Sequence, residues 1–67
     1  MRYYSTQRPV GPGTFPTGYK VEEIHNFDRR TFCEEISREA WGYIDFAESI
    51  PDDIARQYEL TGGKNYD

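Results

Sequence analysis

The chain has 67 residues, a net charge of −4 at pH 7 and 36% hydrophobic residues. This length suffices for one domain, but a chain this short buries only roughly 60% of its unfolded surface, which leaves no room for a deep active site beside a core. Aromatic residues make up 16% of the chain, which argues against disorder and predicts a core built from large rings. We therefore expect a single domain over residues 1–67.

The sequence also predicts a cytoplasmic protein. No stretch approaches the ~20 apolar residues of a membrane span, and the first residues lack the apolar run of a signal peptide. The lone Cys33 cannot form an internal disulfide, which agrees with a reducing compartment.

Charge is spread unevenly along the chain. Residues 1–33 carry five basic and three acidic side chains, a net charge of +2, whereas residues 34–67 carry three basic and nine acidic ones, a net charge of −6. An ordinary solvated acidic surface explains this most simply. A face that meets a basic partner is the functional alternative.

The first half of the chain predicts two strands separated by a loop. Residues 3–8 have the aromatic and polar composition of a strand. Pro9 ends this strand or places it at a sheet edge, and residues 10–18 are rich in glycine and proline and predict a loop. Residues 19–27 predict a second strand. The side chains expected on one face of that strand are Val21, Glu23, His25 and Phe27.

The segment 28–39 is ambiguous. Asp28 can cap a helix in which Phe32 and Ile36 stand four residues apart on the inner face, and this interpretation is slightly favoured. The alternative is a short strand at 31–36 followed by a turn.

The strongest predicted strand runs over residues 40–46, with Trp41 and Tyr43 on one face. Gly42 in its interior predicts either a bulge or a close approach of another backbone.

A short helix is predicted after Pro51, a residue favoured at the first helical position. Asp52 and Asp53 complement the positive end of its dipole, and the stop is expected at 62–63. The apolar residues of its inner face stand four apart: Ile50, Ile54 and Tyr58. Residues 61–67 are expected to be a frayed tail. These elements predict a small α+β fold, a three-stranded, mainly antiparallel sheet with one or two short helices packed on one face.

The residues offer little for catalysis. Cys33 and His25 are the only pair that could form a thiolate dyad, and nothing in the sequence brings them together. One cysteine and one histidine are too few for a structural zinc site. The many carboxylates lack a predicted cleft that would perturb their pKa values. We therefore expect neither enzymatic activity nor a cofactor or metal.

Several stretches of the sequence, taken together, form a pattern that is characteristic of a protein family. They cover residues 1–10, 12–16, 23–28, 39–45 and 58–60. In these stretches the chain resembles short proteins of phages and conjugative elements of Firmicutes that are described as related to defence against restriction. The resemblance covers the chain to about Leu60, and it carries no catalytic residues.

The resemblance implies a non-enzymatic accessory protein of a phage or mobile element. Such a protein would bind a host or element-encoded protein and counter a host defence such as restriction or CRISPR. Acids of the second half and two aromatic anchors form the predicted contact surface. These residues are Glu34, Glu35, Trp41, Tyr43, Asp52 and Asp53.

The alternative is a small nucleic-acid-binding module. Bases interleave with aromatic rings near the N-terminus, as they do on single-strand platforms. The candidate residues are Tyr3, Tyr4, Arg8, Arg29 and Arg30. A pI of about 4.8 argues against this alternative. A homodimer through an open sheet edge is compatible with either hypothesis.

Overall fold

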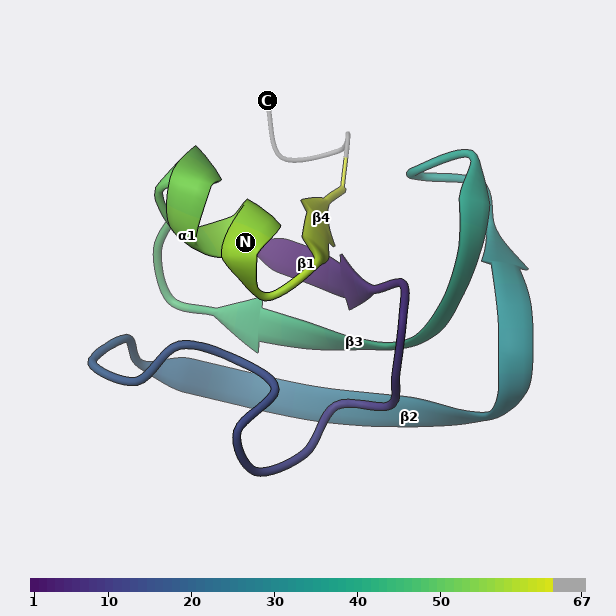
Figure 1. The fold of residues 1–67 in the computed structure, drawn as a ribbon, viewed down its shortest axis with the longest axis horizontal. Coiled ribbons are helices and arrows are strands. Elements are labelled where there is room, and N and C mark those ends of the chain that lie inside the picture. Colours follow the sequence, from purple (N-terminus) through teal and green to yellow (C-terminus); the bar gives the residue numbers. More distant parts are fainter. Residues whose placement is uncertain (64–67) are drawn as a thin grey trace.

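The computed structural model describes residues 1–63, which form one antiparallel sheet and one short helix (Figure 1). The elements in chain order are β1 (Arg2–Ser5), β2 (Val21–Cys33), β3 (Arg38–Phe46), α1 (Asp52–Gln57) and β4 (Leu60–Gly62). The strand order is β2-β3-β1-β4, so the first strand lies between the third and the last. This agrees with an α+β fold, but the sheet has four strands where the sequence predicts three.

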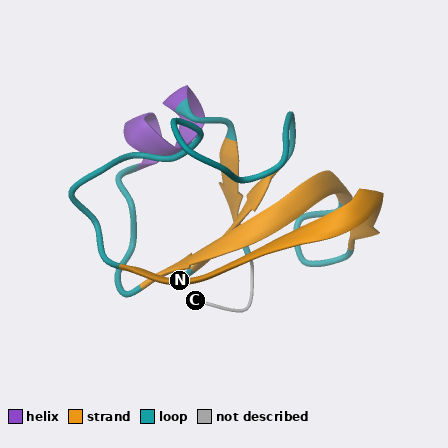
Figure 2. Cartoon of the chain, turned by 90° about the horizontal axis from the view of Figure 1, so that it is seen from below, coloured by secondary structure: helices purple, strands orange, loops and turns teal. Residues whose placement is uncertain are grey.

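One face of the sheet is covered by α1 and by the loop that joins β1 to β2 (Figures 1 and 2). The core on this side centres on Ile44 and Phe46 of β3, which are fully buried. The other buried members of this cluster are Tyr3, Val10, Ile50, Ala55 and Leu60. Ile54 and Tyr58 pack against it, as the predicted helix face requires.

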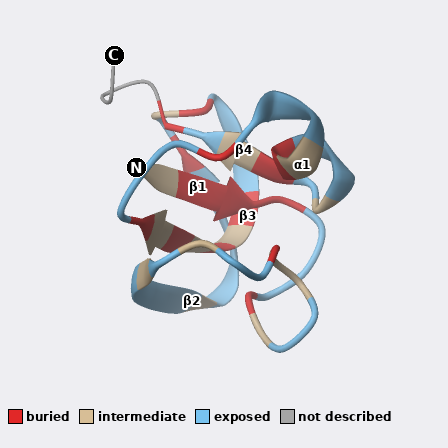
Figure 3. Ribbon diagram, turned by 90° about the vertical axis from the view of Figure 1, so that its left-hand side faces the viewer, coloured by how far each residue is buried: buried red, intermediate tan, exposed pale blue. Residues whose placement is uncertain are grey.

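A second, smaller cluster contains Tyr4, Cys33, Ile36 and Ala40. Most of its residues come from the far end of the β2–β3 hairpin, which curls away from the rest of the sheet (Figure 1). Tyr3 and Tyr4 are consecutive residues of β1, and successive side chains of a strand point to opposite faces. Each tyrosine therefore joins a different cluster, and β1 is buried on both faces. By contrast, β2 is exposed along most of its length (Figure 3).

The predicted strand at 40–46 is confirmed, and of the two alternatives at Gly42 the close backbone approach is correct. A side-chain Cβ at this position would lie 2.5 Å from the backbone oxygen of His25 and 2.6 Å from Oδ1 of Asn26. Asn26 also holds the long loop in place. Its Oδ1 accepts the Val10 N–H at 2.8 Å, and its Nδ2 donates to the Val10 carbonyl at 2.9 Å.

The favoured helix over 28–39 is wrong, and the strand alternative is correct for Thr31 to Cys33. β2 continues to Cys33, a turn follows, and Ser37 adopts a left-handed backbone with φ 56° before β3 begins. Phe32, expected on the inner face of a helix, is 59% exposed. Pairing with β3 buries Cys33 and Ile36 and satisfies the backbone hydrogen-bonding groups of β2. This stabilisation outweighs the weak helical preference that the spacing of Phe32 and Ile36 indicates.

The predicted common face of β2 is interrupted near its start. Val21 pairs with Phe46 and Glu23 pairs with Asp45, so Glu22 is an extra residue in β2. A bulge of this kind shifts the side chains that precede it relative to those that follow. Val21 therefore packs on the α1-side core, whereas Glu23 follows the opposite alternation.

The chain after residue 50 also differs from the prediction. The helix ends at Gln57, because Glu59 turns the chain with φ 58° and Leu60 begins β4. Thr61 and Gly62, predicted to be frayed, pair with Tyr4 and Tyr3 of β1. The rest of the predicted tail, 64–67, lies outside the described residues. The described part of the chain holds no helix with the length and hydrophobicity needed to cross a membrane.

Candidate functional site

The face of the sheet opposite α1 carries a group of polar and aromatic side chains that we call the Tyr43 face. Its members are Arg2, Glu23, His25, Phe27, Tyr43 and Asp45. Strand pairing brings them together: His25 of β2 and Tyr4 of β1 both lie opposite Tyr43 of β3. Asp45 lies between Arg2 and Glu23 in the same way.

Tyr43 is the centre of a stack that crosses three strands. The Arg2 guanidinium carbon lies 3.8 Å from the centroid of the Tyr43 ring, a cation–π contact. The His25 ring stacks on Tyr43 from the neighbouring strand, with centroids 5.3 Å apart and an interplanar angle of 26°. Phe27 meets both rings edge-on, at 6.2 Å from Tyr43 and 5.5 Å from His25.

Arg2 is held in place by Asp45 through two hydrogen bonds. Nε donates to Oδ1 at 2.8 Å and Nη2 donates to Oδ2 at 3.1 Å, the two-pronged geometry that makes such pairs strong. The hydrogen bond to Asp45 raises the pKa of Arg2 above its already high usual value. Because its charge is matched by a carboxylate, Arg2 has little left to offer an anionic ligand.

The Tyr43 hydroxyl donates to Oε2 of Glu23 at 3.4 Å. Partial burial, followed by the nearby carboxylates of Glu23 and Asp45, raises the pKa of the Tyr43 phenol despite the opposing charge of Arg2. The ring therefore presents a neutral hydroxyl at neutral pH.

Glu35 in the β2–β3 turn is tied to this face through Tyr4. The Tyr4 hydroxyl donates to Oε1 of Glu35, and its ring meets Tyr43 edge-on at 6.0 Å. Burial and the contact with Glu35 raise the pKa of Tyr4 to about 12. The other oxygen of Glu35 is buried and has no hydrogen-bond partner within residues 1–63.

The predicted protein-binding residues do not form one surface. Tyr43 and Glu35 come together because both contact Tyr4. The half-buried Trp41 is two residues before Tyr43 in β3, so strand alternation places both side chains on the same face. Glu34 is exposed in the turn. Asp52 and Asp53 are exposed on α1, and α1 and the turn lie at opposite ends of the sheet in Figures 1 and 2.

The residues of the nucleic-acid alternative are placed unfavourably for base stacking. Tyr3 and Tyr4 are each 5% exposed, so neither ring has a free face for a base. Arg8 pairs with Glu59 at 2.5 Å, and Arg30 pairs with Glu39 at 2.6 Å.

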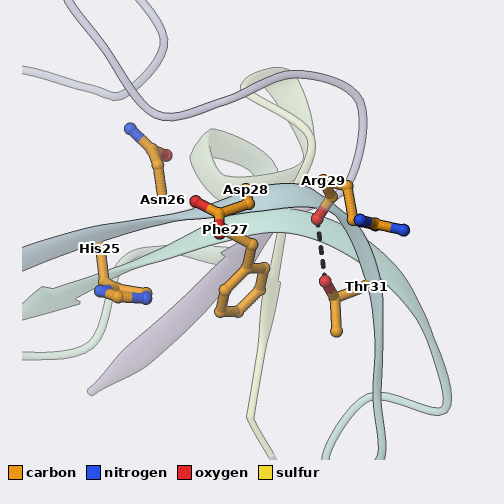
Figure 4. Close-up of a pocket in the computed structure, with 6 residues that line it drawn as sticks. All are labelled: His25, Asn26, Phe27, Asp28, Arg29 and Thr31. Atoms are coloured by element: carbon orange, nitrogen blue, oxygen red, sulfur yellow. Dashed lines mark hydrogen bonds between the residues drawn. The ribbon is translucent and has the colours of Figure 1, made fainter.

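A shallow hollow of about 460 Å³ lies beside the Tyr43 face (Figure 4). All six lining residues belong to β2: His25, Asn26, Phe27, Asp28, Arg29 and Thr31. The hollow forms where the register with β3 shifts between Asn26 and Thr31. There the Thr31 hydroxyl donates to the Arg29 carbonyl at 2.8 Å.

Cys33 and His25 occupy different surroundings. The thiol of Cys33 is buried in the second cluster, and this burial, followed by the charge of Glu35, raises its pKa. A raised pKa disfavours the thiolate that a nucleophile needs. His25 is instead exposed beside Tyr43 and Phe27. Among residues 1–63, no group of three or more His, Cys, Asp or Glu side chains is placed to hold a metal ion.

Comparison with known families gives a match over nearly the whole chain. The family model described as "Defence against restriction A C-terminal" matches residues 1–65. This confirms the resemblance to proteins related to defence against restriction. No curated protein and no solved structure matches the chain.

Proposed function

Because the chain belongs to the defence against restriction A C-terminal family, we propose that it is a non-enzymatic accessory protein of a phage or mobile element. It binds a host protein and thereby weakens restriction of incoming DNA. The proposal includes a cytoplasmic site of action, since the one cysteine is a free thiol that suits a reducing compartment.

The single observation that carries the binding proposal is the stack on the Tyr43 face. Tyrosine, tryptophan and arginine dominate the energetics of protein interfaces, and this face has Arg2 on Tyr43, with Trp41 two residues away. His25 and Asp45 hold these groups in place before any partner arrives. A preformed surface loses less side-chain entropy on binding.

The charge around the stack favours a basic protein surface as the partner. Glu23, Glu35 and Asp45 lie at or beside the rings, and the only cation among the members of the Tyr43 face, Arg2, is paired with Asp45. These carboxylates repel phosphate groups, and nucleic-acid affinity depends on cations at the backbone. Complementary charge would also speed association with a basic partner.

The test combines a capture experiment with a restriction assay. A tagged chain is incubated with nuclease-treated lysate of a restricting host, and bound proteins are identified by mass spectrometry. In parallel, unmodified plasmid is introduced into the same host with and without the chain. We expect a restriction subunit to be enriched and transformation to rise.

Two double variants then locate the surface. His25→Ala with Tyr43→Ala should abolish both effects, whereas Asp52→Asn with Asp53→Asn, on α1, should abolish neither. The thermal midpoint of each variant shows whether it is folded, and Tyr43→Phe, which keeps the ring, should retain binding. Loss of both effects in the α1 variant alone would move the site to the helix. Full activity of a folded Tyr43-face variant would overturn the proposal.

A further inference from the structure

β2 is one of the two edge strands of the sheet and is long for an edge strand. It has 13 residues, whereas the mean strand has about 5–6. Its neighbour in the sheet is β3 alone, so one row of its backbone groups faces outward. Glu22 to Asn26 are all exposed, and Val21 and Phe27 are half-buried. An edge of this kind is a template for another strand.

We propose that two copies of this chain pair through the segment 21–27 of β2. The strands run antiparallel, and a two-fold axis places Ile24 opposite Ile24 of the second copy. The pairing joins the two sheets into one continuous sheet. This inference does not depend on the proposed function.

The side chains of the segment select this register. Opposed side chains share a face in an antiparallel pair, so a symmetric pair must be centred on one residue facing its own copy. Centring on Ile24 brings two apolar side chains together, and Ile24 is 43% exposed in the single chain. It also places Glu23 opposite His25 of the second copy on both sides of the axis.

The neighbouring registers are poorer. Centring on Glu23 opposes two carboxylates, and opposed like charges are destabilising. Centring on His25 opposes two imidazoles and sets Ile24 against the polar Asn26. The register with β3 shifts after Asn26, and this irregularity limits regular pairing farther along the strand.

The outward backbone of this segment is not taken up by the long loop. The loop is joined to β2 at Asn26, and both hydrogen bonds to Val10 use the Asn26 side chain. The Asn26 side chain also lies against Gly42 of β3, on the inner side of β2. The loop is therefore fixed without occupying the backbone groups that the second copy would need.

A cysteine cross-link tests the register directly. Directly opposed residues have Cβ atoms about 4.5–5.5 Å apart, close to the range of about 3.5–4.5 Å that a disulfide spans. In a Cys33→Ala background, Ile24→Cys should form a covalent dimer under mild oxidation. Phe32→Cys is the matched control, because Phe32 is an exposed apolar residue of the same strand beyond the register shift. It should cross-link far less.

Sedimentation equilibrium of the unmodified chain supplies the second measurement. The mass should rise with concentration from 7.9 kDa toward twice that value. Ile24→Asp should weaken association by about tenfold or more. Glu23→Arg should weaken it as well, because it removes the carboxylate that lies opposite the His25 ring, and adding His25→Glu should restore it by placing an Arg–Glu ion pair at the same two positions.

A chain that stays monomeric at every concentration overturns the proposal, and so does equal cross-linking of the two cysteine variants. The result is separable from partner binding, because Ile24 is not on the Tyr43 face. A monomeric Ile24→Asp variant that still captures the host protein would show that the two surfaces are independent.

Discussion

At Gly42 the sheet has no space for a side chain. A Cβ there would lie 2.5 Å from the His25 carbonyl oxygen and 2.9 Å from the Asn26 Cα, and both of these atoms belong to the backbone. Gly42→Ala should therefore lower the free energy of unfolding by about 1–3 kcal/mol, measured by urea denaturation. Gly11→Ala is the control, since no atom lies within 4 Å of a Cβ at that position. Equal effects of the two variants would contradict the close approach.

Tyr4 should make stability depend on alkaline pH. Its pKa is about 12 in the folded chain and about 10 when unfolded, so its contribution is complete below about pH 10 and is lost as the pH rises toward about 12. The pH-dependent part is of the order of 2 kcal/mol. Tyr4→Phe cannot ionise, so the difference in unfolding free energy between the two chains should change across this window. Parallel pH curves would show that Tyr4 has an ordinary pKa.

The β2–β3 turn carries backbone strain at Ser37. Its φ of 56° is unfavourable for a residue with a Cβ and costs roughly 1 kcal/mol, which glycine avoids. Ser37→Gly should raise the thermal midpoint. Ser49→Gly is the matched control at an exposed serine without a positive φ, and it should leave the midpoint unchanged or lower it. A lower midpoint for Ser37→Gly would mean that the turn is not strained.

Secondary structure can be predicted from this sequence where the hydrophobic periodicity of a single segment determines it. The strand at 40–46 alternates between buried and half-buried residues, so its period is visible in the sequence. The prediction for the segment 28–39 is wrong because Phe32 and Ile36 have helical spacing, whereas the structure is decided by pairing with β3 and by burial of Cys33 and Ile36 against Tyr4, more than twenty residues away. β4 has three residues, too few to show a period.

At the scale of the whole molecule, the two clusters should unfold together. Each is too small to be stable alone, and both depend on the pairing of β1 with β3. Ile44→Ala removes a fully buried side chain from the larger cluster and should cost about 2–5 kcal/mol. Far-ultraviolet circular dichroism and Trp41 fluorescence should shift to the same new midpoint. Separate midpoints would show that the smaller cluster unfolds independently.

The candidate site was only half predictable for a related reason. Tyr43 and Trp41 are recognisable as candidate anchors because both lie within one strand. Arg2 and His25 join them because β1 and β2 flank β3. No local sequence pattern predicts this strand order. Glu34 and Glu35 belong with Asp52 and Asp53 to the acidic second half of the sequence, but in the fold the β2–β3 turn and α1 lie at opposite ends of the sheet (Figures 1 and 2).

The central position of β1 in the sheet also affects how the chain folds during its synthesis. β2 and β3 are neighbours in sequence and can pair as soon as both are synthesised, because closing a short loop costs little entropy. β1 is synthesised first, yet Tyr3 has Ile44 and Gly62 as its partners. Tyr4 therefore stays exposed until β3 has been synthesised, and Tyr3 until α1 and β4 have followed. This predicts that the β2–β3 hairpin precedes β1 in folding, and that the nascent chain is most prone to aggregation during this interval.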